Sequence, residues 1–252
     1  MVKTLELLRH RAHRDLTGRF VVEGERFVAR ALDGGWPIER LVVSERARER
    51  TLLRVARERG VPITRLPASE FDSVLHTPGV KIAAILRQRW SSLPEKKGRL
   101  WVAIESNRSP GNLGALLRTM EAAGAHGIIL LSEDCDPFDP VALRGSMGSL
   151  FAQALVRTRY PCFARWVRRR RVTVIGTAVD GSRDYRAQSY RGPVVLMAGH
   201  ERHGLSPQQE AYCDRFVHIP MHGALDSLNL VVATSLVLYE ARNQRHPSRQ
   251  RR

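Results

Sequence analysis

The sequence has little cysteine, comparatively few acidic residues and no long apolar run. Its three cysteines, Cys135, Cys162 and Cys213, stand apart without paired spacing, which argues against a disulfide framework or a cysteine zinc site. No stretch is long and apolar enough to predict a transmembrane helix or a signal peptide. These features together predict a protein of the reducing cytoplasm.

Basic residues are in large excess. The chain has 41 Lys and Arg against 25 Asp and Glu, a formal net charge of +16. They gather between residues 9 and 14, 165 and 171, and 242 and 252. A general abundance of arginine would not produce such clusters, so the charge favours a polyanionic partner, nucleic acid first.

Alternating helix-like and strand-like segments predict two α/β domains. Residues 1–88 alternate short strands and helices, 89–99 lose periodicity and predict a linker, and 100–242 resume the alternation. In the second domain this pattern predicts a mostly parallel sheet covered on both faces. A basic tail occupies 243–252.

Three loops that follow strands of the second domain are rich in glycine and polar residues. They span 105–115, 198–206 and 219–229, and the first enters a helix that carries Arg118. Ligands bind parallel sheets at the carboxyl ends of the strands, so these loops predict a site there. His200 and His203 lack an accompanying set of ligands, which argues against a metal.

The helix after the third loop, 228–239, is apolar on nearly every side. Such a helix is normally buried all round, which predicts burial against the sheet and against a second subunit. We therefore expect a homodimer formed by this helix and the one after Asn112. Asp226 or Ser227 is expected to cap the helix, and Ser206 to cap the helix that begins at Pro207.

The three loops together resemble the SPOUT methyltransferase superfamily, in particular its SpoU/TrmH branch of RNA ribose 2′-O-methyltransferases. The first family motif, Asn-Pro-Gly-Asn-x-Gly-Ala-x-x-Arg-Thr, is similar to Ser109–Thr119. The second, Gly-Asn-Glu-x-x-Gly-Leu-Ser, is similar to Gly199–Ser206, and the third to Ile219–Asn229. The chain departs from the patterns at Ser109, at His200 and at Leu230-Val231, where the family more often has Val-Ser.

The resemblance implies a deep trefoil-knotted domain that binds S-adenosylmethionine, preceded by a small α/β RNA-binding domain. It implies methylation of a ribose 2′-hydroxyl in rRNA or tRNA. Base methylation by another SPOUT branch, or a non-catalytic RNA-binding protein on the same fold, are the alternatives. Arg118 would act as a general base or stabilise the forming alkoxide.

The resemblance also implies roles for individual residues. The implied catalytic residues are Arg118, Asn112, Glu201, Ser227 and Asn229. The cofactor is expected to contact Thr177, Leu196, Gly199, Ile219, Met221, Ser227 and Leu228. From their charge, Arg9, Arg11, Arg19 and Arg144 are expected to contact RNA, with Arg14 as a further candidate; a solvated face is the alternative for the N-terminal arginines.

Overall fold

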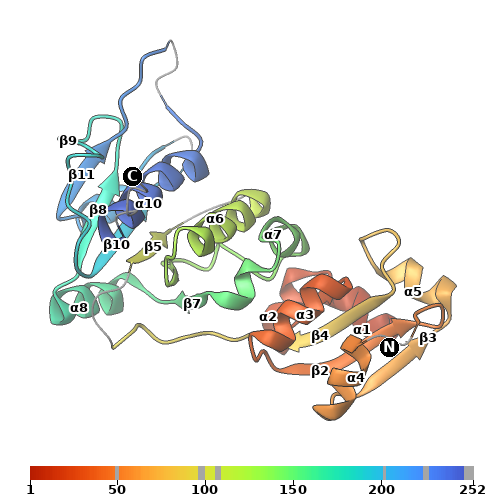
Figure 1. Cartoon of the computed structure of the whole chain (residues 1–252). Helices are drawn as coiled ribbons and strands as arrows, with labels where there is room; N and C mark the ends of the chain where they lie inside the picture. Colours follow the sequence, from red (N-terminus) through yellow and green to blue (C-terminus); the bar gives the residue numbers. More distant parts are fainter. Residues whose placement is uncertain (49–50, 96–99, 106–108, 201–202, 224–226, 247–252) are drawn as a thin grey trace. The chain divides into compact units, whose positions relative to one another are not determined.

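The computed structural model describes residues 1–48, 51–95, 100–105, 109–200, 203–223 and 227–246. The chain divides into two compact units (Figure 1). The first comprises Met1–Arg89 together with Asp136–Ala152, and the second comprises Trp90–Cys135 together with Gln153–Arg252. A segment from the middle of the chain therefore belongs to the N-terminal unit.

The first unit is built on a four-stranded sheet in the order β1-β4-β2-β3. Strand β4 is antiparallel to both of its neighbours, whereas β2 and β3 are parallel. The strands are β1 (Arg19–Glu23), β2 (Ile38–Ser44), β3 (Ile63–Leu66) and β4 (Ile82–Arg87). The helices are α1 (Val2–Leu8), α2 (Arg11–Thr17), α3 (Glu25–Asp33), α4 (Thr51–Glu58), α5 (Ala68–Val74), α7 (Pro140–Gly145) and the 3-10 helix η1 (Ser149–Ala152).

Aromatic side chains explain why the segment Asp136–Ala152 belongs to this unit. The ring of Phe138 lies 4.6 Å from that of Phe20, and the ring of Phe151 lies 5.3 Å from that of Trp36. The indole N–H of Trp36 also donates to the carbonyl oxygen of Phe151, at 3.0 Å. These rings are almost fully buried, so the hydrophobic effect stabilises the attachment of the segment.

The second unit contains the predicted parallel sheet, in the order β7-β6-β5-β10-β8-β11-β9. Every neighbouring pair in it is parallel. The strands are β5 (Leu100–Ile104), β6 (Gly127–Leu130), β7 (Ala154–Arg157), β8 (Thr173–Thr177), β9 (Arg183–Asp184), β10 (Val194–Ala198) and β11 (Arg215–His218).

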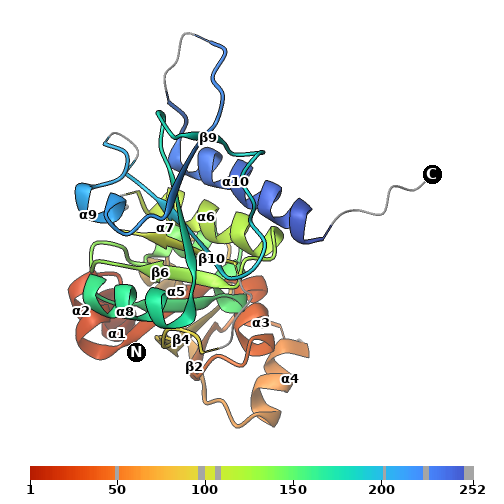
Figure 2. The same ribbon diagram turned by 90° about the vertical axis from the view of Figure 1, so that its left-hand side faces the viewer.

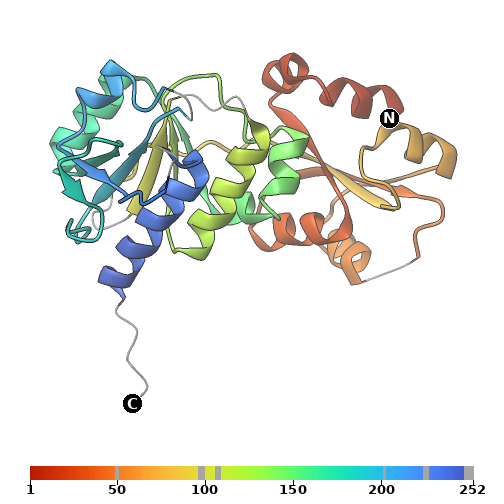
Figure 3. The ribbon, with the colours of Figure 1, turned by 90° about the horizontal axis from the view of Figure 1, so that it is seen from above.

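Helices cover both faces of this sheet, as predicted. Helices α6 (Pro110–Ala122) and α10 (Leu230–Arg245) pack against each other on one face, and α8 (Tyr160–Arg170) and α9 (Pro207–Glu210) lie on the other (Figures 2 and 3). All five residues of β5 and all five of β10 are buried, as expected for central strands covered twice. The core beneath α8 includes Trp101, Ala103, Ile129, Val156, Tyr160, Phe163, Val174, Val195 and Met197.

The expected linker, 89–99, lies in part along the second unit. The backbone N–H of Ser91 donates to the carbonyl oxygen of Leu155, at 2.7 Å, and the guanidinium of Arg157 lies 4.1 Å from the centre of the Trp90 ring. The indole N–H of Trp166 donates to the carbonyl oxygen of Pro94. These contacts attach residues 90–94 to the edge of the sheet.

Within the described part of the chain, no helix is long and apolar enough to cross a membrane. The trefoil knot implied by the resemblance stays a prediction. Residues 201–202 and 224–226, in two of the three motif loops, lie outside the described residues.

Candidate functional site

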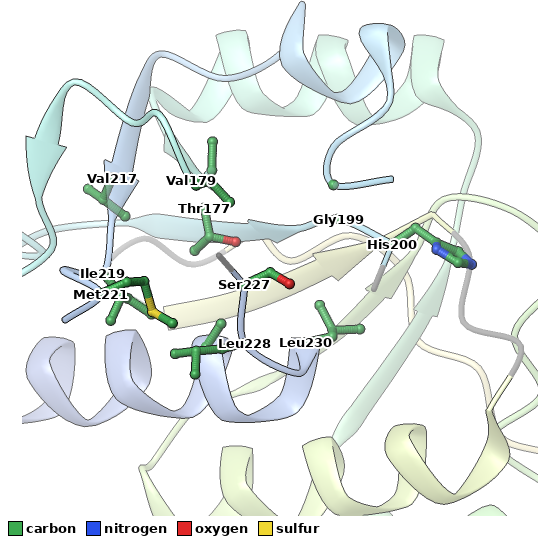
Figure 4. A pocket seen from close by; sticks show the side chains of 13 residues that line it. Thr177, Val179, Gly199, His200, Val217, Ile219, Met221, Ser227, Leu228 and Leu230 are labelled. Carbon is green, nitrogen blue, oxygen red and sulfur yellow. The ribbon is translucent and has the colours of Figure 1, made fainter. Parts of the chain in front are cut away.

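A cavity of about 330 Å³ lies at the carboxyl ends of β8, β10 and β11 (Figure 4). The second and third motif loops form part of its wall, together with the residues that follow β8 and the start of α10. Its position is the one that parallel sheets use for ligands. It is lined by Thr177, Ala178, Val179, Gly199, His200, Gly204, Val217, Ile219, Met221, Ser227, Leu228, Leu230 and Ala233.

Two glycines, Gly199 and Gly204, allow the two ends of the second motif loop to approach each other closely at the edge of the cavity. His200 and Gly204 exchange two backbone hydrogen bonds, of 2.6 and 2.9 Å, which close the loop. A Cβ added at Gly199 would lie 2.2 Å from the carbonyl carbon of Gly204, and Gly204 itself has φ of +66°. A side chain at Gly199 would require the loop to move, and one at Gly204 would strain a backbone in the left-handed region, so backbone forms this part of the wall.

Ser206 anchors the same loop to two strands. It is the N-cap of α9 in a capping box with Gln209, which confirms the predicted cap. The Gln209 amide donates to the carbonyl oxygen of Ala198 at the end of β10, at 3.1 Å. The Ser206 hydroxyl donates to the Glu105 carboxylate, just after β5, at 2.6 Å. This chain of hydrogen bonds joins the second motif loop to the start of the first.

Glu105 lies outside the three family motifs. Its hydrogen bond with Ser206 is visible only in the folded structure. Burial and the neighbouring Glu105 carboxylate raise the pKa of Tyr160 well above its usual value. Tyr160 therefore stays a neutral phenol, stacked at 5.3 Å on Tyr212. The carboxylate at the end of β5 thus has a polar neighbour from α9 and an aromatic one from α8.

The structure gathers most of the predicted cofactor residues around the cavity. Thr177, Gly199, Ile219, Met221, Ser227 and Leu228 all line it. Leu196 does not, because it lies fully buried inside β10, two residues before the strand ends. The prediction omitted several further lining residues, among them Val179, His200, Leu230 and Ala233, although each lies close in sequence to a predicted one.

The predicted catalytic residues are more scattered. Arg118 is exposed on α6 and Asn112 lies in its first turn, and neither lines the cavity within one chain. Ser227 does line it. Asn229 is the N-cap of α10, its side-chain oxygen accepting from the backbone N–H of Val231 at 2.8 Å. Glu201 lies outside the described residues.

That cap corrects one expectation. Ser227 does not cap the last helix, because α10 begins only at Leu230 and Asn229 holds the N-cap position. Asp226, the alternative, lies outside the described residues. The displaced start leaves Ser227 in the wall of the cavity, where its side chain is free of a capping role.

Arg14 was a candidate for RNA contact, and the structure shows that this is wrong. Arg14 is 2% exposed and bonded within its own unit. Of the other expected RNA contacts, Arg144 is exposed in the last turn of α7 and Arg9 is half-buried. Arg11 pairs with Asp15 at 3.3 Å and Arg19 with Glu39 at 3.7 Å, both at partly exposed positions.

Comparison with known proteins identifies the family. Residues 99–239 match the SpoU rRNA Methylase family, and residues 1–79 match the MRM3-like substrate binding domain. This chain belongs to the SpoU rRNA methylase family. The 23S rRNA (uridine(2479)-2′-O)-methyltransferase of Streptomyces viridochromogenes is 33% identical to this SpoU methylase over 95% of its chain and 88% of the relative.

Two further similarities extend over almost the whole SpoU methylase. The 23S rRNA (guanosine(2553)-2′-O)-methyltransferase RlmP of Bacillus subtilis is 29% identical over 96% of this chain and 95% of its own. The crystal structure of an AdoMet-bound rRNA methyltransferase from Sinorhizobium meliloti has a TM-score of 0.88 and 37% identity, covering 98% of this chain and 94% of that one. The chain is an RNA 2′-O-methyltransferase that uses S-adenosylmethionine.

The residues around the cavity fit that cofactor. Its volume is within the range of small-molecule sites, and its wall combines the apolar side chains of Ile219, Met221 and Leu228 with the hydroxyls of Thr177 and Ser227. The apolar side chains suit a planar base, whereas hydroxyls and loop backbone suit the polar groups of a nucleoside. Among the described residues, no group of three or more His, Cys, Asp or Glu is placed to hold a metal.

Proposed function

We propose that this SpoU methylase modifies a ribose 2′-hydroxyl in 23S rRNA and that the cavity at the ends of β8, β10 and β11 holds its S-adenosylmethionine. The observation that carries the proposal is the convergence of the second and third motif loops on one cavity of suitable size. The 23S rRNA specificity of the two similar enzymes supports the choice of RNA.

The two similar enzymes do not identify the nucleotide that this chain methylates. One of them modifies a uridine and the other a guanosine, although both are about equally similar to this chain. The acceptor group is the ribose hydroxyl in either case, so the reacting centre does not need to recognise the base. We infer that contacts away from the reacting ribose choose the position, and that residues 1–88 supply many of them.

The bound cofactor supplies a methyl group already activated on a sulfonium centre. The chain must hold the ribose hydroxyl in line with that group and stabilise the oxygen as its proton passes to water. We assign the second task to Arg118, whose guanidinium offers several donors, with Asn112, Glu201, Ser227 and Asn229 orienting the substrate and the loops. Stabilisation of the alkoxide suits an arginine better than general-base catalysis, because its side chain is normally always protonated.

We also propose that the active form is a homodimer. Val232, Leu236 and Tyr239 are 47%, 38% and 50% exposed and recur every three or four residues, so they form one apolar stripe along α10. Helix α6, which carries Arg118, packs beside α10. A second copy covering the stripe would remove this apolar surface from water and lie close to Arg118.

We make four further assignments: the RNA contacts, the domain bounds, the role of the basic tail and the cellular compartment. Arg9, Arg11, Arg19 and Arg144 would contact RNA phosphates, 100–242 would form the methyltransferase domain after the linker 89–99, and the tail 243–252 would add positive charge. Residues 247–252 of that tail lie outside the described part of the chain. We place the enzyme in the cytoplasm.

Methylation of defined RNA tests the proposal. Purified full-length enzyme with labelled S-adenosylmethionine is incubated with unmodified 23S rRNA transcript and, as a control, with unmodified tRNA. Mass spectrometry of nuclease fragments then locates the methyl group. We expect one 2′-O-methylated nucleotide in 23S rRNA. Labelling of tRNA alone, or of a base instead of a ribose, would overturn the proposal.

A further inference from the structure

The first unit contains a cavity of its own, of about 410 Å³, which no motif of the methyltransferase domain explains. Its walls come from three places: the residues after β2, the end of α5, and the loop that leads into β4. The first unit alone forms it, so its shape does not depend on the second unit. The lining residues are Ser44, Arg46, Asp72, Leu75, His76, Thr77, Pro78, Gly79, Val80 and Lys81.

Hydrogen bonds hold the loop 76–81 in place. The Glu23 carboxylate, at the end of β1, accepts from the backbone N–H groups of His76 and Thr77 at 3.0 and 2.8 Å. At the other end of the loop, the N–H of Ser44 donates to the carbonyl oxygen of Lys81 at 2.9 Å. A wall anchored at both ends is largely preformed, which lowers the entropy lost when a ligand binds.

The lining has the chemistry of a nucleotide site. Arg46 and Lys81 are exposed, and neither side chain forms an ion pair with any acid among the described residues. Other arginines of this unit, such as Arg87 with Glu39, are paired. Two available cations suit a phosphate. The side chains of Leu75, Pro78 and Val80 provide apolar surface for a base, and His76 offers a ring and hydrogen-bonding nitrogens.

We propose that this cavity receives one unpaired nucleotide of the RNA substrate, away from the ribose that is methylated. Its phosphate would lie beside Arg46 and Lys81, and its base against Leu75, Pro78 and Val80. Proteins recognise RNA sequence chiefly through bases that are splayed out of single-stranded loops, and a pocket suits such a base better than a flat cationic surface. The inference rests on the proposed function, because it takes the substrate to be RNA.

At Asp72, a substitution can be chosen for which electrostatics alone predicts tighter RNA binding and occupation of the cavity predicts weaker RNA binding. It is exposed on α5 and lines the cavity. Asp72→Trp removes a negative charge but fills the cavity, whereas Asp72→Asn removes the same charge and leaves the space open. If the cavity holds a nucleotide, Asp72→Trp weakens binding of the 23S rRNA transcript by about tenfold or more, as loss of a base contact does elsewhere. Asp72→Asn leaves binding unchanged or tightens it.

The charged pair is tested by salt dependence. Arg46→Gln with Lys81→Gln should reduce the slope of log K against log salt by roughly two, one for each lost phosphate contact. The matched control, Lys3→Gln with Arg26→Gln, removes two exposed cations of the same unit outside the cavity. It should change the slope less. For Asp72→Trp and for the double variant Arg46→Gln with Lys81→Gln, we expect a raised KM for the RNA, a nearly unchanged kcat and an unchanged cofactor affinity by calorimetry.

The results separate the two proposals. If the wild-type enzyme methylates 23S rRNA but Asp72→Trp binds it as tightly as Asp72→Asn does, the cavity is not a nucleotide site and the proposed function stands. Equal slopes for the cavity pair and the control pair would overturn the phosphate contacts. If the wild-type enzyme methylates no rRNA, the proposed function fails, and the nucleotide site fails with it.

Discussion

The guanidinium of Arg14 lies 2.6 Å from the carboxylate of Asp136, although 122 positions separate them in the chain. The same group lies 3.7 Å from Asp139 and donates to the carbonyl oxygens of Leu8 and Arg9. Both Arg14 and Asp136 are almost completely shielded from water, with side chains 2% and 9% exposed. This ion pair attaches the segment Asp136–Ala152 to the N-terminal helices, together with the aromatic contacts of Phe138 and Phe151.

Replacing Arg14 should therefore destabilise the protein strongly. Arg14→Met leaves the shielded Asp136 carboxylate without its cation, a change that typically costs about 3–5 kcal/mol of unfolding free energy. Urea unfolding followed by circular dichroism measures it. Arg11→Met, which breaks the exposed pair with Asp15, is the control and should change little. Equal losses for the two variants would contradict the structural role of Arg14.

The hydrogen bond between Ser206 and Glu105 predicts that a substitution at one residue can restore the activity lost by a substitution at the other. Ser206→Asp keeps an oxygen that can cap α9 but sets a second carboxylate against Glu105, so the second motif loop should shift. We expect kcat/KM to fall by at least about tenfold, of the order that removal of one positioned hydrogen bond produces elsewhere, with weaker cofactor binding. Adding Glu105→Gln supplies an amide donor for the new carboxylate and should restore most of the activity.

Thermal unfolding is the companion measurement for that pair. Ser206→Asp alone should unfold at a lower temperature than the wild type, because its carboxylate repels Glu105, and the double variant should recover most of that loss because α9 keeps its cap and the repulsion is removed. A double variant as inactive as Ser206→Asp alone would show that the two side chains do not act through each other.

Arg118 should affect the methyl-transfer rate more than any binding step. Arg118→Ala is expected to lower the single-turnover rate by about two orders of magnitude or more, as loss of one preorganised donor does elsewhere. Arg118→Lys should recover little, since lysine keeps the charge but not the planar fork. Cofactor affinity should hold, because Arg118 does not line the cavity. A variant that transfers methyl at nearly the wild-type rate would remove Arg118 from catalysis.

The apolar stripe on α10 provides a test of the proposed dimer. Leu236→Glu places a charge in the middle of the stripe and should shift the protein toward monomer in sedimentation velocity at micromolar concentration. Leu16→Glu is the control, because Leu16 is 82% exposed in the first unit and outside the stripe. A stable, fully active monomer of the wild-type chain would contradict the proposed dimer.

The cysteines should differ in reactivity. Burial, followed by the carboxylates of Asp214 and Glu210, raises the pKa of Cys213 to about 12, whereas Cys162 is exposed. The neutral thiol is favoured in the folded state, so its contribution to stability is present at neutral pH and is lost as pH rises from about 9 toward 12. At pH 8, iodoacetamide should label Cys162 much faster than Cys213, and denaturant should abolish the difference. Equal labelling rates in the folded protein would contradict this assignment.

Local signals in the sequence were sufficient for most of the second unit. Continuous apolar runs such as those of β5 and β10 are typical of strands covered on both faces, and every residue of both strands is buried. The loops after such strands lie at one edge of a parallel sheet, which is why the predicted cofactor residues gather around one cavity.

The errors concern one helix cap and two short helices, all of which the tertiary structure decides. Asn229, instead of Ser227, caps α10, because several polar residues precede the helix and the course of the chain decides which one reaches the free N–H groups. The two N-terminal helices, α1 and α2, were not predicted. Both are only seven residues long, and helices this short are stable mainly through tertiary packing.

The sequence by itself determined the family, the parallel sheet and the loops that form the proposed cofactor cavity, because motif spacing and apolar periodicity are local properties of the chain. Only the tertiary structure decided that Asp136–Ala152 belongs to the N-terminal unit and that Glu105 receives the Ser206 hydroxyl. It also decided that Arg14 is a buried structural cation instead of a phosphate contact. Each of these depends on a pairing across a long stretch of chain, and the stabilisation comes from excluding water around both partners at once.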